Sequence, residues 1–269
     1  MNTGAATRVA IVTGAARGIG AATVAKLMSQ GWAVLAVDIA TDDPVLPYPM
    51  GTRADLDAVV ARAANVGGME RIRAVVADVR DRDAMVDAVA EAERVWGGLD
   101  AAIACAGAIA GGSRQWDLNV EQEQAMLDIN LGGVLSLSRA AIPALLRRPA
   151  PRSGRFVAVA SAATKGLPML AAYCAAKAGV AGLIRALGVE LADTGVSANA
   201  VSPGSTNTPI LDESARLYNL ASGSDFATQQ PMQRVLNAAE IAEVIAFVVS
   251  AENSAMTGAV IPVDGGLAL

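Results

Sequence analysis

Apolar residues gather along this chain in seven short runs that alternate with segments of helical periodicity. The runs are rich in Val, Ile and Ala and lie at about 8–13, 33–38, 72–77, 100–105, 155–160, 196–201 and 259–263. Continuously apolar runs of this length are typical of strands buried on both faces of a sheet. Because helical patterns separate most of the runs, we expect one α/β domain over residues 1–269, with a doubly wound sheet of about seven parallel strands and helices on both faces. Two long helices are expected near 121–147 and 171–193.

The first predicted strand leads into a glycine-rich turn and then into a helix. The turn contains Gly14, Gly18 and Gly20, and the helix is expected from about Ile19 to Gln30. Glycines in a strand-to-helix turn let the backbone approach a pyrophosphate, which binds at the positive end of the helix. Three glycines can also make a tight turn without a ligand. The order of strand, turn, helix and second strand favours a dinucleotide site.

The second predicted strand ends in Asp38. A carboxylate at this point can accept hydrogen bonds from the ribose hydroxyls of an adenosine, and it repels a 2′-phosphate. Arg17, inside the glycine-rich turn, points the other way because a basic residue can bind such a phosphate. Asp38 lies where the ribose hydroxyls are expected, so the sequence predicts NAD as the cofactor.

Tyr173 and Lys177 are four residues apart in AAYCAAKAG, with Ser161 twelve residues before the tyrosine. A spacing of four places both side chains on one face of a helix. An ammonium near a phenol favours the phenolate, so we expect Lys177 to lower the pKa of Tyr173. The chain has no histidine, so any proton chemistry near neutral pH must use a perturbed Tyr, Lys or carboxylate. A tyrosine with a lowered pKa can exchange a proton with an alcohol or carbonyl oxygen.

The glycine spacing GxxxGxG, together with Ser161, Tyr173 and Lys177, resembles the short-chain dehydrogenase/reductase family over about residues 8–266. The resemblance implies a Rossmann-type fold and adds Asn130, in DINLGGV, as the fourth member of a catalytic tetrad. The segment VDGG at 263–266 matches the C-terminal family pattern. The cofactor site that the resemblance and the turn imply comprises Gly14, Arg17, Gly18, Ile19, Gly20, Asp38, Asp78, Val79, Ala106, Gly107, Tyr173, Lys177, Pro203, Gly204, Thr206 and Thr208.

Two departures from the family pattern stand out. The family usually has Asn-Asn-Ala-Gly after the fourth strand, whereas this chain has Ala-Cys-Ala-Gly at 104–107. The missing Asn would have tied neighbouring backbone segments together. The interval between Ser161 and Tyr173 is also one residue shorter than usual, and loops absorb single deletions readily. We therefore keep Ser161 in the expected site.

The segment LPYPMGTRADL at 46–56, with FVAVASAA and VSPGSTNTPI, is similar to the mycofactocin-associated, carveol-dehydrogenase-like branch of the family. That resemblance implies a tightly held NAD and a peptide-derived electron acceptor. We expect the insertion at 41–53 to fold over the adenosine end of the cofactor, with Leu46 and Tyr48 as apolar cover. The alternative is an ordinary surface excursion that contains three prolines.

Residues 209–231 are expected to form a lid over the substrate, because the stretch is long and follows the nicotinamide segment. Its apolar residues, with others upstream, suggest a hydrophobic, terpenoid-like substrate, although they can equally be ordinary packing residues. The residues considered for this pocket are Trp116, Leu167, Met169, Leu211, Leu217, Tyr218 and Phe226.

These features predict interconversion of a hydrophobic secondary alcohol and its ketone, with Tyr173 as acid and base. As the resemblance implies, Lys177 also binds the nicotinamide ribose, Ser161 orients the substrate oxygen, and Asn130 supports a water that links Lys177 to solvent. One alternative is a 3-ketoacyl-thioester reductase of the same fold, which normally uses NADPH; Asp38 argues against it. Another is a non-catalytic NAD-binding regulatory protein, which would not need Tyr173.

Composition and charge exclude some classes of binding partner. The net charge of −5 and the lack of a basic patch argue against nucleic acid. No apolar run approaches 18 residues, so no membrane span is expected and a cytoplasmic protein is predicted. Cys105 and Cys174 show no zinc spacing, so no metal site is expected. The family resemblance implies a homotetramer, in which the two long helices also pack between subunits.

Overall fold

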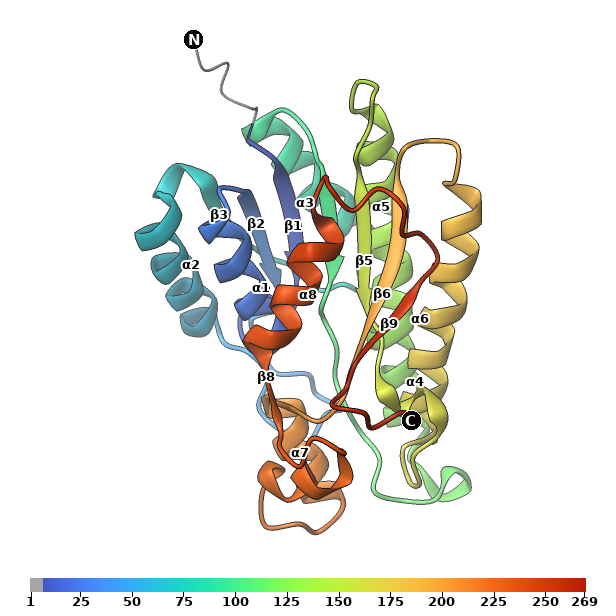
Figure 1. Cartoon of the computed structure of the whole chain (residues 1–269). Coiled ribbons are helices and arrows are strands. Elements are labelled where there is room, and N and C mark those ends of the chain that lie inside the picture. Colours follow the sequence, from blue (N-terminus) through green and yellow to red (C-terminus); the bar gives the residue numbers. More distant parts are fainter. Residues whose placement is uncertain (1–6) are drawn as a thin grey trace.

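The computed structural model describes residues 7–269 and is built around a seven-stranded parallel sheet (Figure 1). The strands lie in the order β3-β2-β1-β4-β5-β6-β9. Their bounds are β1 Val9–Thr13, β2 Ala33–Asp38, β3 Ile72–Val76, β4 Ala101–Ala104, β5 Arg155–Val159, β6 Ser197–Pro203 and β9 Val260–Val263. The predicted Rossmann-type fold is therefore confirmed. A separate parallel pair consists of β7 Thr206–Asn207 and β8 Leu236–Asn237.

Helices cover both faces of the sheet. Helices α1, α2 and α8 share one packed cluster with the strands, while α3, α5 and α6 share another on the opposite face. The helix bounds are α1 Gly18–Ser29, α2 Arg53–Gly67, α3 Arg82–Trp96, α4 Val120–Leu127, α5 Gly133–Arg147, α6 Ala171–Glu190, α7 Pro209–Leu217 and α8 Ala238–Val249. Short 3-10 turns occur at Met69–Arg71, Gln115–Asp117, Ala162–Lys165 and Gly223–Gln229.

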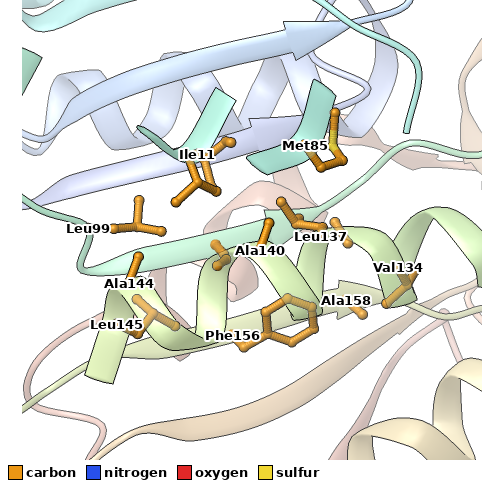
Figure 2. Packing of buried hydrophobic residues seen from close by; sticks show 14 of the residues in the cluster. Ile11, Met85, Leu99, Val134, Leu137, Ala140, Ala144, Leu145, Phe156 and Ala158 are labelled. Atoms are coloured by element: carbon orange, nitrogen blue, oxygen red, sulfur yellow. The ribbon is translucent and has the colours of Figure 1, made fainter. Parts of the chain in front are cut away.

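Small residues let α5 approach the sheet closely. Figure 2 shows Leu137, Ala140 and Ala144 of this helix facing Ile11 and Phe156 of the strands. Both Ile11 and Phe156 are completely buried. Because alanine adds little bulk to the helix face, the larger strand residues fill the space between the two layers. The layers thus form a close-packed core that holds the strand ends in place.

The helix expected over 121–147 is present, but its hydrogen-bond pattern changes in the middle. A π-helical segment, Asp128–Gly132, separates α4 from α5. Within it, the side-chain amide of Asn130 donates to the carbonyl oxygen of Met126 at 3.0 Å. The side chain thereby uses the acceptor that the regular helical ladder would need, and the ladder widens by one residue. The predicted long helix is therefore confirmed over Val120–Arg147, with a π segment inside it. π segments of this kind often accompany functional sites.

Two helical stretches, Val120–Arg147 and Ala171–Glu190, are long and apolar enough to cross a membrane by length and composition alone. Both pack against the sheet, where 61% and 50% of their most apolar windows are buried. Core helices of soluble proteins pass the same test, and we interpret both stretches as core helices.

The strand order reverses between β1 and β4, which are neighbours in the sheet. In open parallel sheets, ligands bind at the carboxyl ends of the strands beside such a reversal. In Figure 1, α7 and the chain that follows it project beyond these carboxyl ends. The topology therefore directs attention to this edge of the sheet.

Candidate active site

A crevice at the carboxyl ends of the strands brings together residues from every part of the chain. It includes all the expected cofactor and catalytic residues except Asn130. The expected residues that line the crevice are Gly14, Arg17, Gly18, Ile19, Gly20, Asp38, Asp78, Val79, Ala106, Gly107, Ser161, Tyr173, Lys177, Pro203, Gly204, Thr206 and Thr208.

The glycine-rich turn provides an anion site at the start of α1. Gly14 has φ 65°, and a Cβ added there would lie 2.6 Å from the Cα of Ala106, so this position requires glycine. Helix α1 begins with no side-chain cap at Arg17 and no acid in its first turn. Free N–H groups, the positive helix end and a guanidinium together suit a pyrophosphate.

Asp38 is held rigidly beside this turn. One carboxylate oxygen accepts from the backbone N–H of Ala16 at 2.9 Å, and the other accepts from Ala40 at 3.0 Å. Asp38 is only 8% exposed. Because a carboxylate oxygen has two lone pairs, each oxygen can still accept from a ribose hydroxyl on the crevice side. The geometry thus suits a dinucleotide whose adenosine ribose has no 2′-phosphate.

Tyr173, Lys177 and Ser161 meet at the opposite end of the crevice. Tyr173 and Lys177 lie on the buried face of α6, with the ammonium nitrogen 5.9 Å from the centre of the tyrosine ring. The ammonium donates to the carbonyl oxygen of Val159 at 2.9 Å. Ser161 begins the turn after β5, and its hydroxyl lies near enough to Tyr173 to lower the pKa of the phenol. The shortened loop therefore still brings Ser161 to Tyr173.

Burial dominates the protonation of this group. It raises the pKa of Tyr173 to about 12, against the smaller lowering effect of Ser161. It also lowers the pKa of Lys177 to about 8. The expected lowering of the Tyr173 pKa was wrong in its net direction, because desolvation of the buried phenol outweighs the effects that lower it. Tyr173 is therefore held as a neutral phenol that can donate its proton.

The lowered pKa of Lys177 leads to a testable pH dependence of stability. Between pH 8 and pH 10.5 the unfolded chain holds a proton on Lys177 that the folded chain has lost. The free energy of unfolding should therefore rise with pH in this window. Chemical denaturation without nucleotide should show this rise in wild type relative to Lys177→Met. The comparison is needed because buried thiols such as Cys105 also titrate differently in the folded and unfolded chain, and both proteins share that effect. Parallel curves for the two proteins would contradict the assignment.

Asn130 lies behind the crevice wall. It is fully buried, and its side-chain oxygen accepts from the N–H of Ala108 at 3.2 Å. Its amide nitrogen donates to the carbonyl oxygen of Ala108 at 2.9 Å. The side chain thus fixes the segment after β4, close to Gly107.

The structure adds an ion pair that the sequence did not reveal. Arg80 contacts Asp78 at 2.6 Å and also Asp43 at 2.8 Å, and all three residues line the crevice. The Asp43 side chain is only 2% exposed. Arg80 and Asp43 come from separate connections between strands and helices, so no local spacing could have indicated their contact.

Gln230 is another residue of the site that the sequence did not reveal, and it is fully buried. Its side-chain oxygen accepts from the N–H of Ser205 at 2.8 Å, and it therefore holds the segment that follows Pro203-Gly204. Asp264, in VDGG, accepts from the N–H groups of Gly266 and Ala268. The C-terminal motif thus shapes its own turn beside the crevice.

The part of the crevice beyond Tyr173 is apolar, but only some of the apolar residues expected in the pocket line it. Leu167, Leu211, Tyr218 and Phe226 line it. Three of the expected residues do not, because Leu217 packs near Gly112 while Met169 and Trp116 are 37% and 77% exposed. The Tyr218 hydroxyl donates to the carbonyl oxygen of Pro168 at 2.6 Å. This bond ties the end of α7 to the loop after β5.

Residues 14–268 match the family model described as Enoyl-(Acyl carrier protein) reductase. The chain is 33% identical to the (-)-trans-carveol dehydrogenase of Rhodococcus erythropolis, covering 97% of this chain and 98% of that one. It is 36% identical to the short-chain reductase protein NovJ of Streptomyces niveus, covering 96% and 93%. The crystal structure of carveol dehydrogenase from Mycobacterium avium in complex with NAD superposes with a TM-score of 0.91 at 32% identity, covering 97% and 98%.

The chain therefore belongs to the short-chain dehydrogenase/reductase family. Within that family it resembles carveol dehydrogenases, as expected from residues 46–56.

Proposed function

We propose that this oxidoreductase interconverts an apolar secondary alcohol and its ketone with NAD as cofactor. The observation that carries the proposal is one continuous crevice with Asp38 and the glycine-rich turn at one end and Ser161, Tyr173 and Lys177 at the other. The apolar lining beyond Tyr173 favours a hydrophobic substrate. A cyclic terpene alcohol of the carveol type is the substrate class best supported by the similar proteins.

The chain's own residues supply binding and proton transfer. When bound, NAD would accept hydride from the carbinol carbon. In reduction Tyr173 gives its proton to the carbonyl oxygen and becomes a phenolate, and in oxidation the phenolate form takes the hydroxyl proton. Ser161 hydrogen-bonds the same substrate oxygen. Lys177 is buried beneath the tyrosine ring, where its ammonium opposes the cost of a transient phenolate. Asn130 keeps the neighbouring backbone in place.

The test of this proposal is oxidation of carveol. Wild-type protein with NAD should convert carveol to carvone, followed by absorbance of reduced cofactor and by chromatography of the product. An artificial electron acceptor should be included, because a tightly held cofactor would limit turnover with added NAD alone. Reduction of a ketoacyl thioester with NADPH, without any oxidation of carveol, would favour the thioester reductase instead.

The connection 41–53 is proposed to retain the cofactor. Asp43, Met50 and Gly51 line the crevice beside Asp38, and the Arg80–Asp43 ion pair fastens the connection to the segment after β3. Such a cover slows cofactor release, so reoxidation by a separate electron carrier, such as mycofactocin, becomes the expected route.

Asp43→Asn is expected to speed dissociation of NAD by about tenfold, because it removes the charge that pairs with Arg80. Dissociation is measured by dilution of NAD-loaded protein and detection of released nucleotide. Replacing 43–51 with a Gly-Ser turn should have a larger effect in the same direction. Fast dissociation in wild type that neither variant changes would show a freely exchanging dehydrogenase.

We also propose a cytoplasmic homotetramer. Leu135 on α5, Val189 on α6 and Phe247 on α8 are 45%, 78% and 58% exposed in the single chain. Exposed apolar side chains on the outer helices are candidates for burial between copies. Analytical ultracentrifugation measures the assembly directly.

A further inference from the structure

The middle of the connection 41–53 lies at the substrate end of the crevice as well as near the cofactor. Leu46 is 6% exposed, and it shares one packed cluster with Ile109 and Tyr173. Tyr48 packs against the same cluster and also borders a groove beside Pro209 of α7. These apolar residues were expected to cover the adenosine. They pack instead with Ile109 and Tyr173, although the groove beside Tyr48 also includes Arg17.

Tyr48 makes a specific contact with the cavity wall. Its hydroxyl oxygen accepts from the backbone N–H of Ile109 at 3.0 Å. Ile109 is 2% exposed and lines the crevice, whereas Tyr48 does not line it. A buried N–H without a partner is costly, so this contact decides where the Ile109 backbone lies.

The wall segment, residues 108–110, lies outside any helix or strand. Side chains from other elements hold it residue by residue. Asn130 holds Ala108 through both its N–H and its carbonyl oxygen. The N–H of Ala110 points to the sulfur of Met126 at 3.1 Å. Between them, Ile109 depends on Tyr48 alone among the described residues for its N–H partner. Loss of the Tyr48 hydroxyl would therefore free Ile109, which is the residue of 108–110 that lines the crevice.

We propose that Tyr48 is a positioning residue for substrate selectivity, acting through the backbone of Ile109. This inference rests on the proposed oxidation of an apolar alcohol and assigns the connection 41–53 a second role at the same site. A fixed wall discriminates among ring substituents, since each buried methylene contact contributes to the preference. A loosened wall loses those contacts with a large substrate and changes little for a small one.

The experiment compares Tyr48→Phe with wild type on carveol and on cyclohexanol, a bare ring, with NAD and an artificial electron acceptor. Tyr48→Phe keeps the ring packing and removes the acceptor. The ratio of kcat/KM for carveol to that for cyclohexanol should fall by about tenfold, mainly through the KM of carveol. Hydrogen–deuterium exchange of the peptide 105–112, which needs no substrate, should become faster.

Asp43→Asn is the matched control, because it loosens the other end of the connection and leaves the Tyr48–Ile109 contact in place. It should alter NAD dissociation without changing the selectivity ratio. The proposal is overturned if Tyr48→Phe changes neither the ratio nor the exchange, or if it only speeds loss of NAD. If wild type oxidises neither alcohol, the proposed function fails separately. The same comparison is then made by measuring how much each alcohol raises the thermal stability of wild type and of Tyr48→Phe. A preference for carveol that Tyr48→Phe abolishes supports the positioning role, and an unchanged preference overturns it.

Discussion

Replacing Tyr173 with Phe should lower turnover of any accepted alcohol by about 10²–10⁴-fold, the usual loss when an acid–base group is removed. The tyrosine is 8% exposed, so Phe keeps nearly all of its packing and the fold should persist. NAD binding should stay near the wild-type level, because Asp38 and the glycine-rich turn lie at the other end of the crevice. Steady-state kinetics and calorimetric NAD titration measure the two effects separately.

Ser161→Ala is the companion variant. It removes the hydroxyl that lowers the pKa of Tyr173 but leaves the phenol itself. Its turnover should fall less than that of Tyr173→Phe, and its pH profile for oxidation should shift to higher pH because the phenol becomes harder to ionise.

Near-normal turnover of Tyr173→Phe on an accepted alcohol would disprove the mechanism.

Replacing Asp38 with Ser should reduce the preference for NAD over NADP by about tenfold or more, because a negative charge near a 2′-phosphate costs roughly 1–4 kcal/mol at contact distances. Arg17 lines the same crevice and would then be free to bind the phosphate. Binding of both cofactors to wild type and variant by calorimetry measures the change.

Asp38 also has a structural role that the experiment must separate. Its carboxylate accepts from Ala16 and Ala40, so a small substituent leaves two backbone N–H groups without their partner. Asp38→Asn is the matched control, since it removes the charge and retains a side-chain acceptor. Thermal stability of the two variants reports the structural loss. If wild type prefers NADP, the interpretation of Asp38 is wrong and Arg17 becomes the selector.

Local patterns in the sequence were enough to predict the sheet, the glycine-rich turn and the placement of Tyr173 beside Lys177. Strands buried on both faces are continuously apolar, and residues four apart share a helix face, so neither feature needs knowledge of distant contacts. The position of Asp38 at the end of β2 follows from the same regularity. These are the parts of the crevice that short-range geometry determines.

Long-range contacts and burial decided the rest. The high pKa of Tyr173 arises because the folded chain excludes water from the phenol, which no spacing reveals. Trp116, expected in the pocket, faces solvent because its turn lies on the surface. Tyr48 meets Ile109 across 61 positions of the chain. Contacts between such distant residues depend on how irregular segments pack together, so only the tertiary structure could place the connection 41–53 against the crevice wall at Ile109.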